Sequence, residues 1–138
     1  MKEDGFTLIE MLVVLSMLSV MALIAFPLEF RVLKEQQEKQ FLNTLASDVM
    51  NIQQRSTIST GMNRITFYED SYLVRSEQSE IIRDYPDGLT IDTRTNRTIN
   101  FNHNGNIKNP RTLFISGPIQ HYRMVFPFGK GRFYLEKQ

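Results

Sequence analysis

Glu10 is the residue whose surroundings most clearly need a chemical explanation. It directly precedes Met11–Leu28, a run in which no residue is charged. A carboxylate inside a membrane segment costs about 2.5–3.5 kcal/mol on insertion scales, so such a residue is a functional-site hypothesis by default. Two roles are open. Glu10 either gains about 0.3–1 kcal/mol locally at the positive end of a helix, or it pairs with a cation at the same depth, which offsets the cost of burying either group.

The histidines offer little to an enzyme. His103 and His121 are the only two in the sequence, they lie on separate segments, and there is no cysteine. Without cysteine there is no disulfide, thiol nucleophile or cysteine zinc site. The sequence shows no nucleophile elbow and no phosphate-binding glycine loop, because Gly129–Gly131 is too short and precedes a strand. We therefore expect no catalytic residue, no metal and no cofactor, with His103 in a turn and His121 at a strand edge.

A second group of residues could bind a partner. Basic side chains recur after residue 90, where Asp92 and Glu136 are the only acids. A basic face with interleaved aromatic rings can hold a nucleic-acid backbone. The alternative, which the pattern favours, is that the strands turn the rings into the core and the arginines into solvent. The candidate DNA contacts are Arg94, Arg97, Lys108, Arg111, Arg123, Lys130 and Arg132, and the rings are Phe101, Phe114, Tyr122 and Tyr134.

Residues 6–28 are expected to form the helix that carries Glu10. A bilayer core needs about 20 apolar residues in helical form, and the polar Ser16 and Ser19 can bond back to helix carbonyls. An ordinary secretory signal fits less well, because its apolar region is only about 7–15 residues and follows a basic segment. A plain membrane anchor is the other alternative. Pro27 lacks an N–H and frees one helix carbonyl, so we expect a kink there.

Residues 29–61 continue the helix as an amphipathic segment, with apolar residues at helical spacing. Glu35–Lys39 is expected to be a solvated face, and Gly61 a C′ residue, because glycine adopts the left-handed conformation without strain. A helix from about Phe6 to Ser59 exceeds the roughly 8–20 residues typical of globular proteins. A helix half in a membrane and half against a soluble domain explains this length. The apolar stripe comprises Phe30, Leu33, Phe41, Leu42, Leu45, Ala46, Val49, Met50 and Ile52.

Residues 62–138 change to short β-rich runs separated by turn residues. Turn signals occur at Glu69–Ser71, at Pro86–Gly88 and at Asn104-Gly105. Many short strands after one long helix indicate an α+β fold, with the helix packed on an antiparallel β-rich headgroup. The length of 138 residues suggests one domain plus the anchor, and the net charge of +1 gives no global attraction to nucleic acid. The expected strands are 64–68, 72–75, 80–83, 89–92, 98–101, 112–115, 122–126 and 132–135.

The hexapeptide Gly5-Phe6-Thr7-Leu8-Ile9-Glu10, between a charged leader and an uncharged helix, resembles the class III signal of type IV pilins and type II secretion pseudopilins. The resemblance implies that residues 1–5 are a leader peptide, that a prepilin peptidase cuts after Gly5, and that Phe6 becomes an N-methylated terminus. It also implies that Glu10 brings subunits into the filament by pairing with the methylated amine of a neighbouring Phe6. The family often has a proline where Pro27 falls.

The C-terminal half is similar to the headgroup of H-type pseudopilins through Asn100–Gly105 and Gly129–Arg132. The overall layout is similar to minor pseudopilins of competence pili, which take up transforming DNA. This resemblance implies a non-enzymatic structural subunit, stored in the plasma membrane with its headgroup outside and displayed at the cell surface after assembly. Its partners would be other pilins, the prepilin peptidase, the plasma membrane and an assembly platform protein, with any DNA contact indirect. The alternatives are a minor pseudopilin of a type II secretion system and an anchored headgroup that binds DNA itself.

Overall fold

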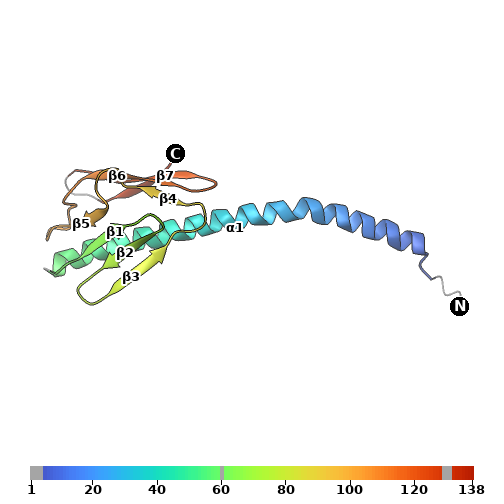
Figure 1. Cartoon of the computed structure of the whole chain (residues 1–138), viewed down its shortest axis with the longest axis horizontal. Coiled ribbons are helices and arrows are strands. Elements are labelled where there is room, and N and C mark those ends of the chain that lie inside the picture. Colours follow the sequence, from blue (N-terminus) through green and yellow to red (C-terminus); the bar gives the residue numbers. More distant parts are fainter. Residues whose placement is uncertain (1–4, 60, 129–131) are drawn as a thin grey trace. The chain divides into compact units, whose positions relative to one another are not determined.

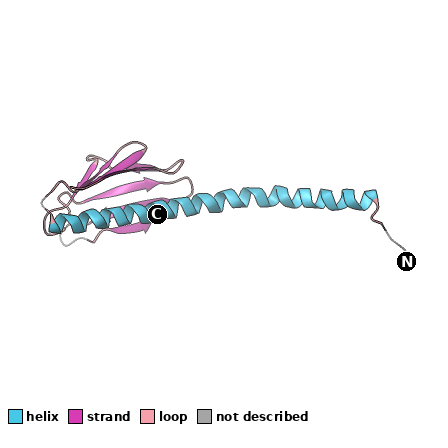
Figure 2. Cartoon of the chain, turned by 90° about the horizontal axis from the view of Figure 1, so that it is seen from below, coloured by secondary structure: helices cyan, strands magenta, loops and turns pink. Residues whose placement is uncertain are grey.

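The computed structural model describes residues 5–59, 61–128 and 132–138, except for the side chains of residues 25–29. Within these residues one helix is followed by eight strands (Figure 1). The chain divides into two compact units, residues 1–35 and residues 36–138, and we call the second the headgroup unit. The strands all belong to the headgroup unit, together with the C-terminal part of the helix (Figure 2). The predicted α+β fold is confirmed.

The helix α1 spans Leu8–Ile58, so it begins two residues later than the sequence pattern predicted. Thr7 sets this start, because its hydroxyl oxygen accepts a hydrogen bond from the N–H of Glu10 at 3.3 Å and its carbonyl accepts one from Met11 at 3.2 Å. A threonine that satisfies an otherwise unpaired N–H in this way is an N-cap. The last helical bond beyond α1 joins the N–H of Ser59 to the carbonyl of Arg55 at 2.9 Å.

The prediction that Gly61 is the C′ residue of α1 in a left-handed conformation stays a prediction, because its φ angle depends on residue 60, which lies outside the described residues. Positive φ angles occur at Gly88, Gly105 and Arg94. A Cβ atom at position 61 would collide with the side chain of Glu77. Glycine at this position leaves room for the Glu77 side chain.

The strands form two antiparallel four-stranded sheets rather than one. Strand positions follow the sequence prediction closely, and the turn at 86–88 connects one sheet to the other. The first sheet has the order β3 (Glu80–Asp84), β2 (Ser71–Arg75), β1 (Arg64–Phe67) and β5 (Thr98–Asn100). The second has the order β4 (Thr90–Asp92), β6 (Arg111–Ser116), β7 (His121–Phe126) and β8 (Tyr134–Lys137).

A single apolar core joins the helix to both sheets. Leu45 and Val49 of α1 are fully buried in one cluster with Ile65 of the first sheet and Leu113 of the second. The apolar face of the helix begins at Phe41, and not at Phe30 as the stripe predicted. The side chains predicted for the stripe that are instead exposed are Phe30, Leu33 and Met50.

Candidate functional site

The N-terminal motif lies at the start of α1 and is open to solvent. Gly5 and Phe6 precede the helix, Phe6 is 79% exposed, and no atom approaches within 4 Å of a Cβ built on Gly5. The peptide bond between them is therefore accessible to a peptidase. The removal of residues before Phe6 would leave a free amine close to the first turn of the helix.

Glu10 occupies the third position of the helix, counted from the Thr7 cap. The spacing Thr7-x-x-Glu10 is that of a capping box, in which threonine accepts from the N–H of the third residue. The structure shows this hydrogen bond from the N–H of Glu10 to the Thr7 hydroxyl. The Thr7-x-x-Glu10 spacing is visible in the sequence, but the prediction from apolar periodicity did not use it. The Glu10 carboxylate is exposed, so it is accessible both to the local helix end and to a second chain.

The apolar segment that follows exposes its side chains on every face. All described side chains from Gly5 to Ile24 are exposed. Ser16 and Ser19 donate to the carbonyls of Val13 at 2.7 Å and Leu15 at 2.8 Å, as predicted. Among the described residues, no helix has both the length and the apolar content needed to cross a membrane. The predicted kink at Pro27 falls on side chains outside the described residues.

Glu38 corrects the prediction of a solvated face at residues 35–39. Its side chain is 1% exposed, and one of its oxygens accepts a hydrogen bond from the N–H of Ile119 at 3.0 Å. Gly117 makes room for it, because a Cβ there would lie 2.7 Å from the carboxylate. Glu38 therefore joins α1 to the turn between β6 and β7, a contact that helical periodicity does not reveal.

Asp48 makes the corresponding contact with the first sheet. Its carboxylate accepts from the hydroxyl of Tyr72 at 2.8 Å and from Nε of Arg83 at 2.7 Å. Burial raises the pKa of the Tyr72 hydroxyl, and the bond to Asp48 raises it further. The same carboxylate raises the pKa of Arg83. These groups fix the helix against β2 and β3 and have the character of a structural network.

The predicted DNA contacts do not form one continuous surface of uncommitted charge. Arg94 pairs with Asp92 at 3.3 Å and lies 4.8 Å from the ring centre of Phe114. Arg123 pairs with Glu136 at 2.5 Å. The two acids of this region are thus each occupied by an arginine.

The remaining candidates differ in their environment. The guanidinium of Arg111 donates to the carbonyls of Asn96 and Thr98, and burial lowers the pKa of this side chain. Arg97, Lys108 and Arg132 are exposed, and Lys130 lies outside the described residues. Tyr122 and Phe101 are buried as expected, whereas Tyr134 is 46% exposed.

The two histidines lie on separate elements of the described part of the chain. His103 lies in a turn and His121 begins β7, both exposed, in the positions predicted for them. The described residues contain no cluster of histidine and acidic side chains that could hold a metal.

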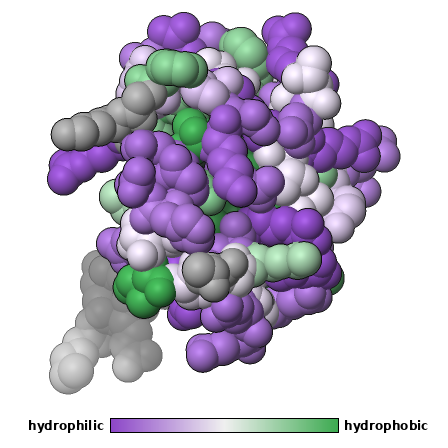
Figure 3. Space-filling view, turned by 90° about the vertical axis from the view of Figure 1, so that its left-hand side faces the viewer, coloured by the Kyte–Doolittle hydropathy of each residue, from purple (hydrophilic) through white to green (hydrophobic). Residues whose placement is uncertain are grey.

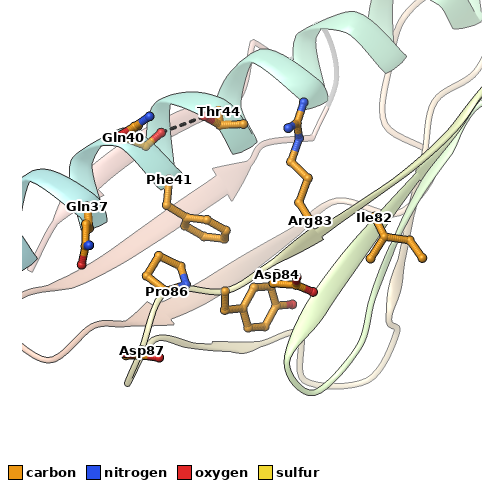
Figure 4. A pocket seen from close by; sticks show the side chains of 10 residues that line it. Gln37, Gln40, Phe41, Thr44, Ile82, Arg83, Asp84, Pro86 and Asp87 are labelled. Atoms are coloured by element: carbon orange, nitrogen blue, oxygen red, sulfur yellow. Dashed lines mark hydrogen bonds between the residues drawn. The ribbon is translucent and has the colours of Figure 1, made fainter.

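One open cavity lies between α1 and the end of β3 (Figure 4). It encloses about 550 Å³ between Phe41 and Gln37 on the helix and the segment Ile82–Asp87. The side chains of Arg83 and Phe41 line it. The hydrogen bond drawn in Figure 4 lies within the helix, where the Thr44 hydroxyl donates to the carbonyl of Gln40 at 2.9 Å. Its lining shows no arrangement of acid, base and nucleophile.

The described chain thus has a capped apolar helix, an exposed Gly5–Phe6 junction and a β-rich headgroup. The family described as Prokaryotic N-terminal methylation motif matches residues 1–26. The chain therefore carries this methylation motif at its N-terminus.

The chain is also 27% identical to "Competence protein ComGD" of Bacillus subtilis (strain 168). This similarity extends over 138 residues and covers 99% of this chain and 96% of that relative. No solved structure matches the chain.

Proposed function

We propose that the chain is a minor pseudopilin of a competence pilus and is needed for DNA uptake in transformation. The observation that carries the proposal is the similarity to a competence protein over nearly the whole of both chains. The similarity continues beyond the N-terminal motif into the headgroup. The headgroup is bound tightly to its own helix through Glu38 and Asp48, which supports a structural role.

In this proposal residues 6–28 hold the precursor in the plasma membrane, with residues 1–5 in the cytoplasm and the headgroup outside. The exposure of every described side chain from Gly5 to Ile24 supports this, because an apolar surface on all faces needs an apolar environment. Residues 25–28 complete the proposed anchor, and their side chains lie outside the described residues. Other pilins and an assembly platform protein would then draw the subunit into the filament.

Processing is the first test of this proposal. The mature chain is expected to begin at N-methylated Phe6, which intact-mass and N-terminal analysis of the protein from cells would show. Gly5→Val should leave the precursor uncleaved, because the side chain would crowd the peptidase. A mature terminus at Phe26 or beyond would establish an ordinary signal peptide and contradict the proposal.

The cellular system is tested by deletion of the gene. We expect loss of transformation with normal secretion of exoproteins, and recovery of transformation when the wild-type chain is restored. Normal transformation together with failed secretion would assign the protein to a type II secretion system. Such a result would leave the pseudopilin class intact and overturn only the competence role.

A further inference from the structure

A second cavity lies where α1 ends, and its lining is rich in hydrogen-bond donors. It encloses about 390 Å³ between the end of the helix, the start of β1 and the segment 100–108. Figure 3 views the headgroup unit from this end, where hydrophilic residues predominate. The described lining residues are Ser56, Ser59, Gly61, Met62, Asn63, Arg64, Asn100, Phe101, Asn102, His103 and Lys108.

The charges of this cavity have one sign. Arg64 and Lys108 line it, and no carboxylate does so among its described residues. Glu77 packs against Gly61 at the edge of this cavity and lines the adjacent one. Arg64 faces Arg75 across the sheet, and Arg75 is itself paired with Glu80. Among the described residues, Arg64 therefore forms no ion pair with an acid.

Two donors of the cavity are buried without an acceptor. Asn63 is 8% exposed, and its side-chain Nδ2 has no hydrogen-bond partner. The Nε atom of Arg64 is likewise buried and unpaired. A buried polar atom that lacks a partner costs about 1–3 kcal/mol, and native proteins contain few of them. The ammonium group of Lys108 is exposed and can meet an acceptor from outside the chain directly. The two buried donors would be satisfied by the same acceptor after a small movement of the Asn63 and Arg64 side chains.

The backbone holds these donors in fixed positions. Arg64 lies opposite Asn100 in the register of β1 and β5, and the N–H of Lys108 donates to the carbonyl of Asn100 at 2.9 Å. Asn102 fixes the turn that carries His103, because its Oδ1 accepts from the N–H groups of Asn104 at 3.0 Å and Asn106 at 2.9 Å. Three segments of the chain thus place donors around one space before any ligand enters.

We propose that this cavity is a binding site for a phosphate group. Phosphate oxyanions accept several charge-assisted hydrogen bonds at once, from lysine and from the planar donors of arginine. The group can come from free phosphate or from the backbone of DNA. The second source rests on the proposed function, since a competence pseudopilin meets DNA outside the membrane. Of the residues first considered as DNA contacts, only Lys108 belongs to this site.

The test measures binding of inorganic phosphate and of a short DNA duplex to the purified full chain in detergent micelles. Lys108→Gln and Asn63→Asp should each weaken both by about tenfold or more, since a hydrogen bond to a charged group contributes on that order. Lys108→Gln should also lower the salt slope of DNA binding by about one. Lys137→Gln, which removes the same charge from exposed β8, should change neither affinity. A duplex with a neutral methylphosphonate backbone should not bind.

The outcomes separate the site from the proposed function. Phosphate binding without DNA binding would support the site and assign it to free phosphate. Binding of both by the wild type, with normal transformation by the Lys108→Gln strain, would support the site and deny it a role in uptake. Equal losses in Lys108→Gln and Lys137→Gln would show diffuse surface attraction and overturn the site. A wild-type protein that binds neither inorganic phosphate nor DNA would overturn the site as well.

Discussion

The two parts of α1 use apolar residues in opposite ways. In the unit of residues 1–35 the described apolar side chains are exposed around the whole helix, and Leu15, for example, is 57% exposed. In the headgroup unit the apolar residues lie on one face, where Leu45 and Val49 are 0% exposed. A helix that is apolar on one face needs a single partner, whereas one that is apolar all round needs an apolar environment. The same helix therefore presents two different kinds of surface along its length.

Polar side chains show the same contrast. The hydroxyl groups of Ser16 and Ser19 donate to carbonyls three and four residues earlier, so each has a hydrogen-bond partner inside the helix. In the proposed membrane anchor, where no water is available, such internal hydrogen bonds would be required. Glu38 and Asp48 instead bond to groups that are 81, 35 and 24 residues away in sequence. The second part of the helix is thus defined by tertiary contacts and the first by local ones.

The largest effect is expected from a matched pair of leucine substitutions. Leu45→Ala should lower the free energy of unfolding of the headgroup unit by about 2–5 kcal/mol, because it leaves a cavity in a sealed core. Leu15→Ala removes the same atoms from an exposed position and should change it by no more than about 0.5 kcal/mol. Denaturant unfolding in detergent, followed by near-ultraviolet circular dichroism of the tyrosines, measures both. Equal effects would erase the distinction between the two parts.

A smaller effect is expected from the tertiary polar network. Tyr72→Phe removes the hydroxyl that donates to Asp48 and should destabilise the headgroup unit by about 1.5–3 kcal/mol, the contribution of a hydrogen bond to a charged group. Tyr68→Phe is the control, because that ring is 48% exposed and its hydroxyl makes no described hydrogen bond. The same unfolding assay applies, and an unchanged Tyr72→Phe protein would show that the Asp48 contact adds nothing.

The network also predicts a dependence on pH at the alkaline end. Burial first and the bond to Asp48 second raise the pKa of Tyr72 above the unfolded value of about 10. The protonated hydroxyl is favoured in the folded state, so its stabilising contribution is complete below about pH 10 and is lost as the pH rises beyond that value. Wild-type stability should fall more steeply there than that of Tyr72→Phe. Tyr85, whose pKa burial also raises, is present in both proteins and cancels.

The fold could be predicted from the sequence because its signals are local. Alternation and turn residues located the strands, and an uncharged run located the helix. Glu38 was misplaced because its partner, Ile119, lies on a turn that no helical pattern can reveal. The approach of Glu77 to Gly61 was missed for the same reason, because it is a tertiary contact that helical periodicity does not reveal.

The two candidate sites differ in the same way, as local and non-local arrangements. Gly5, Phe6 and Glu10 lie close together in sequence, so a motif was enough to select them. The phosphate cavity is built from the end of α1, from β1 and from the segment after β5. Sequence reasoning selected Lys108 for its charge alone and omitted Arg64 and Asn63. Their unpaired donors become visible only when the three segments are placed together.

The smallest expected effect on stability separates the two roles of Glu10. Thr7→Val keeps the shape of the side chain and removes the oxygen that caps α1, at a cost of about 0.5–2 kcal/mol to the helix end. Glu10→Gln retains a residue that suits a capping box and removes only the charge. The two substitutions therefore divide a local role from an electrostatic one.

We expect Glu10 to act between subunits, by pairing with the methylated amine of a neighbouring Phe6. Glu10→Gln should then be processed normally and remain in the membrane fraction, but be lost from sheared filaments, with reduced transformation. Thr7→Val should still enter filaments, because the charge and its partner are intact. A blot of the shear fraction, read beside the transformation frequency, measures both. If Thr7→Val is absent from sheared filaments and Glu10→Gln is present in them, pairing between subunits is contradicted. Assembly would then depend on the cap of α1 and not on the charge of Glu10.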